Sequence, residues 1–375
     1  MADVFTPSAV EKNFFVDSIP CENRGRAFSV NDMFNRKATR AFVNDARLHD
    51  TNFAFLTTTL AKLHTKLYEP KHWTTYAQDI PIDVGGGFVD YVSYYTVDWA
   101  GIMNEFRNVV GNNANYIPRV NAGLNQKRVN VYTFEVAYDL RFIELEKMKK
   151  LTLQKSIQDI YQNAIVAGWD LFVQKVAYLG VDGKTGLFNS ADVKTYTITN
   201  TPAAGGTQGD GFEGLADTAV VSFFNGVFAE YLLNSNMNIT LLPDTFLVPT
   251  YVGSDLSSRF SALYTSTLRK FILDHNLGSD ESNGDMKISI LSRPDLNKLG
   301  TGSHGRIVAY RRDKDFVRLD MPYPMQHYIT LPNIDKMSYT SAFVGQVSEV
   351  QMPYNTSNTE MGAVTYWDFA AGKAE

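Results

Sequence analysis

Residues 152–180 read TLQKSIQDIYQNAIVAGWDLFVQKVAYLG and carry the longest helical pattern in the chain. Apolar residues recur there every three or four positions, which predicts one helix with a broad buried face that includes Ile160 and Leu171. Thr152 is the expected N-cap, and Gly180 suits the left-handed position that ends a helix. Such a helix would be about 40 Å long. Because a compact active site needs nothing so long, we expect other elements to lie along it, although a core helix of an ordinary globular fold would show the same periodicity.

The composition bounds the class of protein. The 375 residues are 44% hydrophobic, which is ample for a core, and the net charge of −5 argues against a dedicated nucleic-acid binder. The single cysteine, Cys21, cannot form an intrachain disulfide. The start MADVFTPSAVEKNFF lacks a secretory pattern, and no apolar run is long enough to span a membrane. We therefore expect a soluble protein that is made in a reducing cytoplasm and has no membrane partner.

The N-terminal part has little periodicity. Residues 1–50 mix turn residues, scattered aromatics and balanced charges, which favours either an extended arm that docks on a neighbouring surface or a partly disordered end. Residues 53–67, FAFLTTTLAKLHTKL, show helical spacing, and Pro70 ends that pattern.

Two stretches then alternate with period two. Residues 88–99, FVDYVSYYTVDW, and residues 127–138, KRVNVYTFEVAY, place apolar and aromatic residues on one face, and turn-prone residues lie between them. The pattern predicts a long two-stranded flap with a loop at its tip. Since an isolated ribbon is marginal in water, a flap this long implies a partner surface.

The rest of the chain mixes helices and strands. Residues 141–150 predict a short charged helix, and residues 215–233 and 256–276 predict further helices. Strands are expected at 241–249, in MKISILS, and repeatedly from 306 onward. Strands both before and after the main helices indicate an α+β fold.

No catalytic, cofactor or metal residue can be assigned. The histidines at 49, 64, 72, 275, 304 and 327 lack the spacing of a zinc site. The triplet Gly85, Gly86 and Gly87 lacks the lysine of a phosphate loop and is expected to be a turn. The acidic residues of 280–285 lack the pattern of an EF-hand and are expected to be a solvated turn. We expect no enzymatic activity.

The order of these parts resembles the major capsid protein of tailed phages, the Hong Kong ninety-seven type fold that encapsulin nanocompartments share. The resemblance covers nearly the whole chain and rests on the arm, the flap, the short acidic helix IELEKM, the long spine helix and four further phrases. These phrases are GLFN at 186–189, LLPDTFLVP at 241–249, GRIVAYRRDKDFVRLDMPYP at 305–324 and VGQVSEVQMP at 344–353.

The resemblance implies a domain plan. It divides the chain into an N-terminal arm at 1–50, a helix and lead-in at 51–78, an extended β-hairpin E-loop at 79–136, a P-domain at 137–190 with the spine helix at 152–179, an A-domain at 191–340, and C-terminal strands at 341–375 that return to the P-domain. The arm is too short to hold the scaffolding domain of some members, so the resemblance implies a separate scaffolding protein or none. Some members cross-link a flap lysine to a neighbour's asparagine, but neither Lys127 nor any asparagine can be assigned that role.

The resemblance also implies a function. The chain is expected to be a structural subunit that assembles with itself as hexamers and pentamers into an icosahedral head around double-stranded DNA. The family allows scaffolding, portal and decoration proteins as further partners. Localisation would be the virion, after assembly in the cytoplasm of a host bacterium.

Two alternatives remain open from the sequence. An encapsulin-like shell would hold a protein cargo instead of DNA. An α+β enzyme with an unrecognised site would elute as a small oligomer, whereas a capsid subunit would elute as capsomers or shells.

Overall fold

The structure is a computed structural model that describes residues 70–100, 121–149, 156–198, 211–235, 237–261, 264–355 and 361–369. The predicted arm at 1–50, the predicted helix at 53–67 and the flap tip lie outside these residues, as do Thr152 and Cys21.

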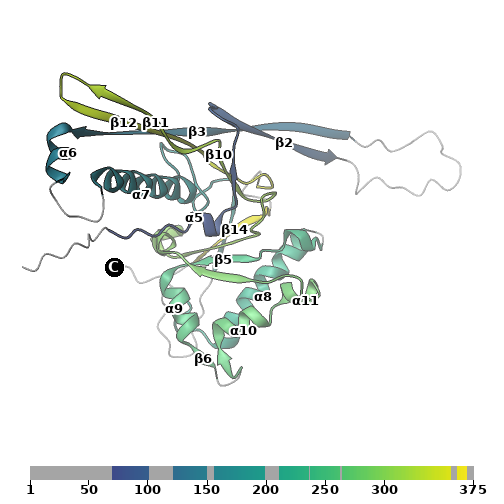
Figure 1. Cartoon of the computed structure of the whole chain (residues 1–375). Coiled ribbons are helices and arrows are strands. Elements are labelled where there is room, and N and C mark those ends of the chain that lie inside the picture. Colours follow the sequence, from purple (N-terminus) through teal and green to yellow (C-terminus); the bar gives the residue numbers. More distant parts are fainter. Residues whose placement is uncertain are drawn as a thin grey trace, which may run out of the picture. The chain divides into compact units, whose positions relative to one another are not determined.

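Helices and strands occur together throughout the described part, which confirms the α+β class (Figure 1). The α-helices are α5 Tyr76–Asp79, α6 Phe142–Lys149, α7 Ile157–Tyr178, α8 Asp217–Asn234, α9 Thr250–Ser258, α10 Leu268–Asp274 and α11 Leu277–Glu281. Short 3₁₀ turns are η3 Ile239–Leu241, η4 Pro294–Lys298 and η5 Thr301–Ser303.

Two sheets organise the described residues. A four-stranded antiparallel sheet has the order β11-β12-β3-β2, with β2 Tyr91–Ala100, β3 Asn121–Arg141, β11 Tyr323–Asn333 and β12 Ser338–Ser348. A five-stranded mixed sheet has the order β4-β14-β9-β5-β8, with β4 Lys194–Ile198, β5 Thr245–Val248, β8 Ser289–Ser292, β9 Arg306–Tyr310 and β14 Val364–Phe369. Two smaller sheets join β1 Ile82–Val84, β10 Arg318–Met321 and β13 Val350–Gln351, and β6 Phe260–Ser261 with β7 Ser266–Thr267.

The predicted long helix is α7, but it begins later than expected. Ser156 is its N-cap, and the Ser156 side chain accepts a hydrogen bond from the Gln158 amide at 3.1 Å. Asp159 completes the capping box by accepting from the Ser156 amide. The prediction of Thr152 as N-cap is therefore wrong, because a serine followed three residues later by an acidic residue is the stronger start signal. The helix has 22 residues and is about 33 Å long.

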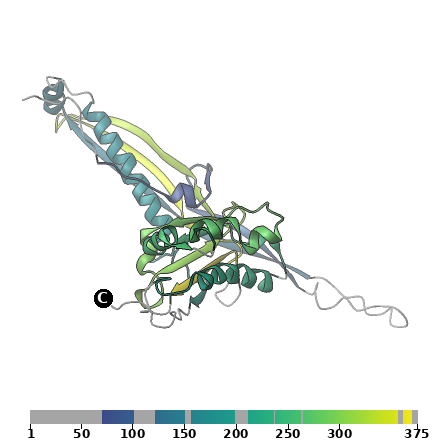
Figure 2. The same cartoon turned by 90° about the horizontal axis from the view of Figure 1, so that it is seen from below.

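One face of α7 packs on the four-stranded sheet, and the helix runs alongside these strands in a second view (Figure 2). Trp169 and Phe172 contact Phe134 of β3, with ring centroids 5.6 Å and 5.2 Å apart. Leu171, which the sequence analysis placed on the buried face, is 43% exposed. The helix has two apolar stripes, and among the residues that the structure describes the sheet covers the stripe that contains Trp169.

The C-terminal end of α7 explains the phrase GLFN. Gly180 has φ +77°, as predicted for the residue that ends the helix. The amides of Leu187 and Phe188 donate to the carbonyls of Ala177 and Tyr178 and so satisfy the last turn of the helix. A Cβ on Gly186 would lie 2.5 Å from the Tyr178 backbone, so this close approach requires glycine.

The five-stranded sheet has a second hydrophobic core on the face opposite to α7. The predicted apolar stripe of α8 is buried there, and all four residues of β5 are buried. The single helix expected at 256–276 is instead α9 and α10, separated by the β6–β7 hairpin, in which Thr265 has φ +54°. A non-glycine residue in that conformation marks a turn, which helical periodicity does not reveal.

Strand pairing divides the chain differently from the domain plan in two places. Strand β11 lies within the predicted A-domain range but pairs with β12. Strand β14 lies within the C-terminal range expected to return to the P-domain but pairs with β4 and β9. Both differences arise because strands far apart in sequence pair by register, which the order of the elements does not show.

Candidate assembly surfaces

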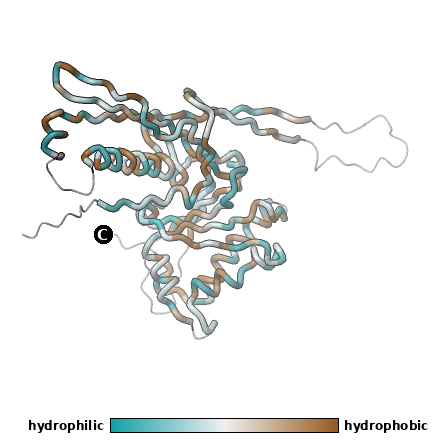
Figure 3. Tube along the Cα trace, in the orientation of Figure 1, coloured by the Kyte–Doolittle hydropathy of each residue, from teal (hydrophilic) through white to brown (hydrophobic). Residues whose placement is uncertain are grey.

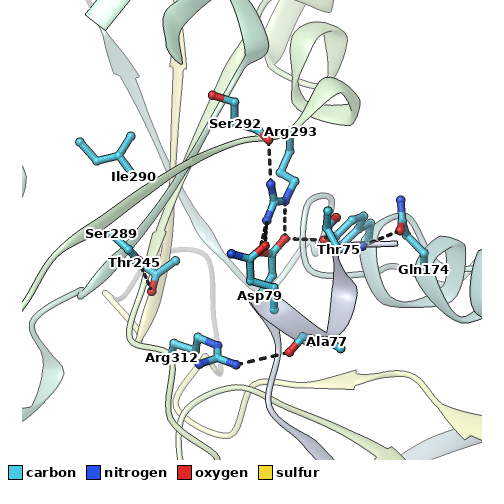
Figure 4. A network of polar contacts seen from close by, with 12 residues as sticks. Thr75, Ala77, Asp79, Gln174, Thr245, Ser289, Ile290, Ser292, Arg293 and Arg312 are labelled. Carbon is cyan, nitrogen blue, oxygen red and sulfur yellow. Dashed lines mark hydrogen bonds and ion pairs between the residues drawn. The ribbon is translucent and has the colours of Figure 1, made fainter. Parts of the chain in front are cut away.

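A buried polar network joins α5 to α7 and to the five-stranded sheet (Figure 4). Asp79 of α5 is fully buried, and its carboxylate forms an ion pair with Arg293, which follows β8. Tyr178 at the end of α7 donates a hydrogen bond to the same carboxylate. Burial and the adjacent Asp79 carboxylate raise the pKa of Tyr178, so its hydroxyl remains a donor. The network fixes α5 against the spine helix and the five-stranded sheet.

The flap consists of β2 and residues 121–130 of β3. Ten residues of β2 pair with this part of β3, from Tyr91 opposite Asn130 to Ala100 opposite Asn121. The rest of β3 pairs with β12, beginning with Val131 opposite Ser348. The flap therefore has one pair of strands, as predicted, and it continues directly from the sheet that covers α7 (Figure 1).

One face of the flap contacts the body of the subunit near the base. Tyr94 and Val129 are buried on this face. Lys127 forms an ion pair with Asp192 at 2.8 Å. Lys127, considered above for a cross-link, thus has an acidic partner within its own chain.

The opposite face of the flap, here called the open face, is apolar and exposed. It comprises Tyr91, Tyr95, Val97 and Leu124, and both flap strands carry hydrophobic as well as hydrophilic segments (Figure 3). Tyr95 is 60% exposed and Leu124 is 69% exposed. The predicted aromatic face therefore exists, and nothing in the described part of the subunit covers it.

The second stripe of α7, here called the open stripe, is the other large uncovered surface. It comprises Ile160, Ala164, Ala167 and Leu171, which are exposed or only partly buried. A groove beside it holds about 450 Å³ and is lined by residues that include Trp73, Val166 and Ala167. A helix that is apolar on two sides is normally covered on both, so this surface is suited to contact with another chain.

A third uncovered area lies where α6 meets the β11–β12 turn. The Phe142 amide donates to the Met337 carbonyl, which holds α6 against this turn. Large apolar side chains exposed here are Phe142, Ile143, Leu331, Ile334 and Met337. Three exposed apolar surfaces on one subunit are more than a monomeric protein normally carries.

The described residues hold no arrangement that suggests chemistry. None of their His, Cys, Asp or Glu side chains form a group of three that could hold a metal ion. Gly85, Gly86 and Gly87 all have positive φ, and the Gly85 and Gly87 amides donate to the Met321 and Pro322 carbonyls, so the triplet follows the end of β10 and does not form the predicted turn. None of the helices in the described ranges is long and apolar enough to cross a membrane. His49 and His64 lie outside the described residues.

Sequence reasoning missed the residues that hold these surfaces in place. Asp79 and Arg293 are 214 positions apart, and the Asn130 and Glu349 side chains that meet at the flap base are 219 positions apart. Neither pair has a local signature. The sequence offered only the order of the elements as a signal for these residues. That order predicted the flap but not the residues that contact it.

Solved structures with a similar fold come from phages and from a GTA particle. The capsid of Myoviridae phage XM1 is 16% identical, with a TM-score of 0.61 over 83% of this chain and 97% of that chain. The capsid of a native GTA particle is 12% identical, with a TM-score of 0.53 over 87% of this chain and 99% of that one. A chain of Mycobacterium phage Bobi is 11% identical, with a TM-score of 0.52 over 85% and 98% of the two chains. The fold is therefore that of a capsid subunit.

Sequence comparison identifies the family. The model of the major capsid protein family matches residues 107–359, which is more than half of the chain. No curated protein sequence matches significantly. This chain belongs to the major capsid protein family, and its role is structural.

Proposed function

We propose that this chain forms the icosahedral head of a tailed phage, in which hexamers and pentamers of the subunit enclose double-stranded DNA. Family membership and the phage capsids of similar fold support the proposal. The net charge of −5 suits a wall that confines DNA without binding it tightly. The subunit would reside in the virion after assembly in the host cytoplasm, and it would have no enzymatic activity.

The observation that carries the proposal is the open face of the flap. A two-stranded ribbon is marginal in water, and this one exposes Tyr95, Val97 and Leu124 on the same side. A second copy of the chain would bury that side in the shell. The flap is then an assembly arm, and it corresponds to the E-loop of the plan above.

The test separates assembly from folding. The double variant Tyr95→Ser and Leu124→Ser removes the two largest contacts of the open face. Each lost contact is worth about 1.5–3 kcal/mol, so subunit association should weaken by roughly a hundredfold or more. The matched control is Phe260→Ser, which changes a similarly exposed apolar residue on β6.

Circular dichroism melts and sedimentation report the two outcomes. We expect the double variant to melt cooperatively like the parent but to yield few closed particles, while the control yields normal particles. Normal particles from the double variant would contradict an assembly role for the flap. Loss of its cooperative melt would show that the open face belongs to the subunit's own core.

The contents of the particles test the rest of the proposal. Particles purified from producing cells should contain double-stranded DNA that survives nuclease treatment of the intact shell. A protein cargo without DNA would contradict a phage head and favour the nanocompartment alternative.

A further inference from the structure

The flap begins where two strands change partners at the same point. Strand β12 pairs with β3 up to Ser348 opposite Val131, and the chain then turns so that β13 pairs with β10 instead. Beyond this point β3 has only β2 as a neighbour. Glu349 is the residue between β12 and β13, so it sits at the junction of the flap and the body.

Glu349 makes three contacts to β3 across that junction. Its amide donates to the Asn130 carbonyl at 3.1 Å. Its Oε1 atom accepts from Asn130 Nδ2 at 3.0 Å and lies 3.1 Å from the Tyr132 hydroxyl. The side chain therefore spans the step from Asn130, in the flap, to Tyr132, in the sheet.

Neighbouring contacts hold the body side of the junction. The Tyr132 hydroxyl also lies 3.1 Å from the Val181 carbonyl, in the loop after α7. Gln346 is buried, accepts from the Val89 amide at 3.1 Å and donates to Thr133 at 2.9 Å. Tyr132 and the base of β2 are thus fixed to the body. The flap side is held by the buried side chains of Tyr94 and Val129, by the Asn130 hydrogen bond and by the half-exposed Lys127–Asp192 ion pair.

We infer that Glu349 is a positioning residue that sets the direction in which the flap leaves the subunit. Strand β3 runs unbroken through the Asn130–Val131 step, and the two hydrogen bonds of Glu349 Oε1 join the residues on either side of that step, so they restrain the flap from swinging there. The exposed Lys127–Asp192 pair is worth little by comparison, since such pairs contribute about 0–1 kcal/mol. This inference concerns the subunit alone and holds whether or not the flap contacts a neighbour.

The test measures the direction of the flap. Spin labels are placed at Gln126→Cys in the flap and Lys175→Cys on α7, in a full-length chain that carries Cys21→Ser. Labelled chain is mixed with excess unlabelled chain, so that distances between subunits do not contribute. The distance distribution is compared for Glu349→Ala, which removes the acceptor, and Glu349→Gln, which keeps an oxygen acceptor at the same place.

We expect a single narrow maximum for the parent and for Glu349→Gln, and loss of that single maximum for Glu349→Ala. The cooperative melt should be retained in both variants, because a merely structural role would change the melt and leave the flap direction unchanged. Asn130→Ala removes one contact from the exposed side and should give intermediate broadening. The Asn130→Ala variant keeps the test decisive if Glu349→Ala fails to fold.

An unchanged distance distribution in Glu349→Ala, or in Asn130→Ala where only that variant folds, would overturn the inference. Equal broadening in Glu349→Gln would overturn the role of the hydrogen bonds.

Discussion

The two halves of β3 belong to one continuous strand but have different surroundings. In residues 131–141 the strand pairs with β12, and the rings of Phe134 and Tyr138 contact rings of α7. In residues 121–130 the strand pairs with β2 alone, and Leu124 is exposed. Alternation of apolar residues therefore identifies a strand but does not show what covers it.

The spine helix shows the same division. Trp169 and Val173 are buried against the rest of the subunit, whereas Leu171, two positions from each, is exposed. Both stripes are apolar because both are expected to be covered in the assembled particle, one by the subunit and the other by another chain. In this chain the covered core and the proposed assembly surface consist of the same types of apolar residue.

The largest expected effect comes from a charge placed on each stripe of α7. Val173→Asp buries an unpaired carboxylate at a fully covered position, which costs several kcal/mol or more against a total stability of about 5–15. We expect no soluble folded protein. Leu171→Asp should fold, with a loss of about 1 kcal/mol or less. Expression tests and urea unfolding followed by circular dichroism measure both.

The contrast between the two positions is the control. If both variants were insoluble, the open stripe would be part of the subunit's own core. If Val173→Asp unfolded cooperatively at ordinary urea concentrations, the assignment of the covered stripe would be wrong.

A smaller effect compares two leucines of one strand. Leu140, in the covered half of β3, is 1% exposed, and Leu140→Ala should lower the free energy of unfolding by about 2–5 kcal/mol. Leu124→Ala, in the flap, should change it by about 0.5 kcal/mol or less. Equal losses in urea unfolding of the unassembled subunit would show that the flap folds back on its own body.

Much of the fold could be predicted from local sequence patterns. The spine helix, the flap strands, α8 and β5 were all predicted from the spacing of apolar residues, because that spacing reflects a buried face within one element. The end of the spine at Gly180 was also predicted, since a helix needs a left-handed residue there. The start was misplaced at Thr152 because the residue types of Ser156 and Asp159 were read as part of the helix.

The rest depends on contacts that are distant in sequence. The Asp79–Arg293 ion pair and the Glu349 contacts join elements that no spacing relates. The exposure of Leu171 could not be predicted either, since a stripe that other chains would cover looks like core. The assembly surfaces therefore required the structure, even though the order of elements had indicated the family.

The smallest effect is a pH dependence at one buried tyrosine. Tyr231 is buried beneath the five-stranded sheet, where its hydroxyl lies 3.0 Å from Thr365 Oγ1. Burial raises the pKa of Tyr231 above its ordinary value of 10.0. Below pH 10 both the folded and the unfolded chain hold this proton, so the contribution of Tyr231 to stability is complete there.

Above pH 10 the unfolded chain releases the proton while the folded chain keeps it, so the free energy of unfolding falls as pH rises towards the folded pKa. The slope of the free energy of unfolding from one such group is about 1.4 kcal/mol per pH unit.

Tyr231→Phe removes this slope but also removes the hydroxyl's hydrogen bonds, which costs about 1 kcal/mol at every pH. The variant should therefore be less stable than the parent at pH 8, and its deficit should shrink or reverse by pH 11. Urea unfolding at both pH values measures this, and the other buried tyrosines cancel because they are common to both chains. Parallel curves would mean that Tyr231 titrates alike in the folded and unfolded states, which would contradict the prediction.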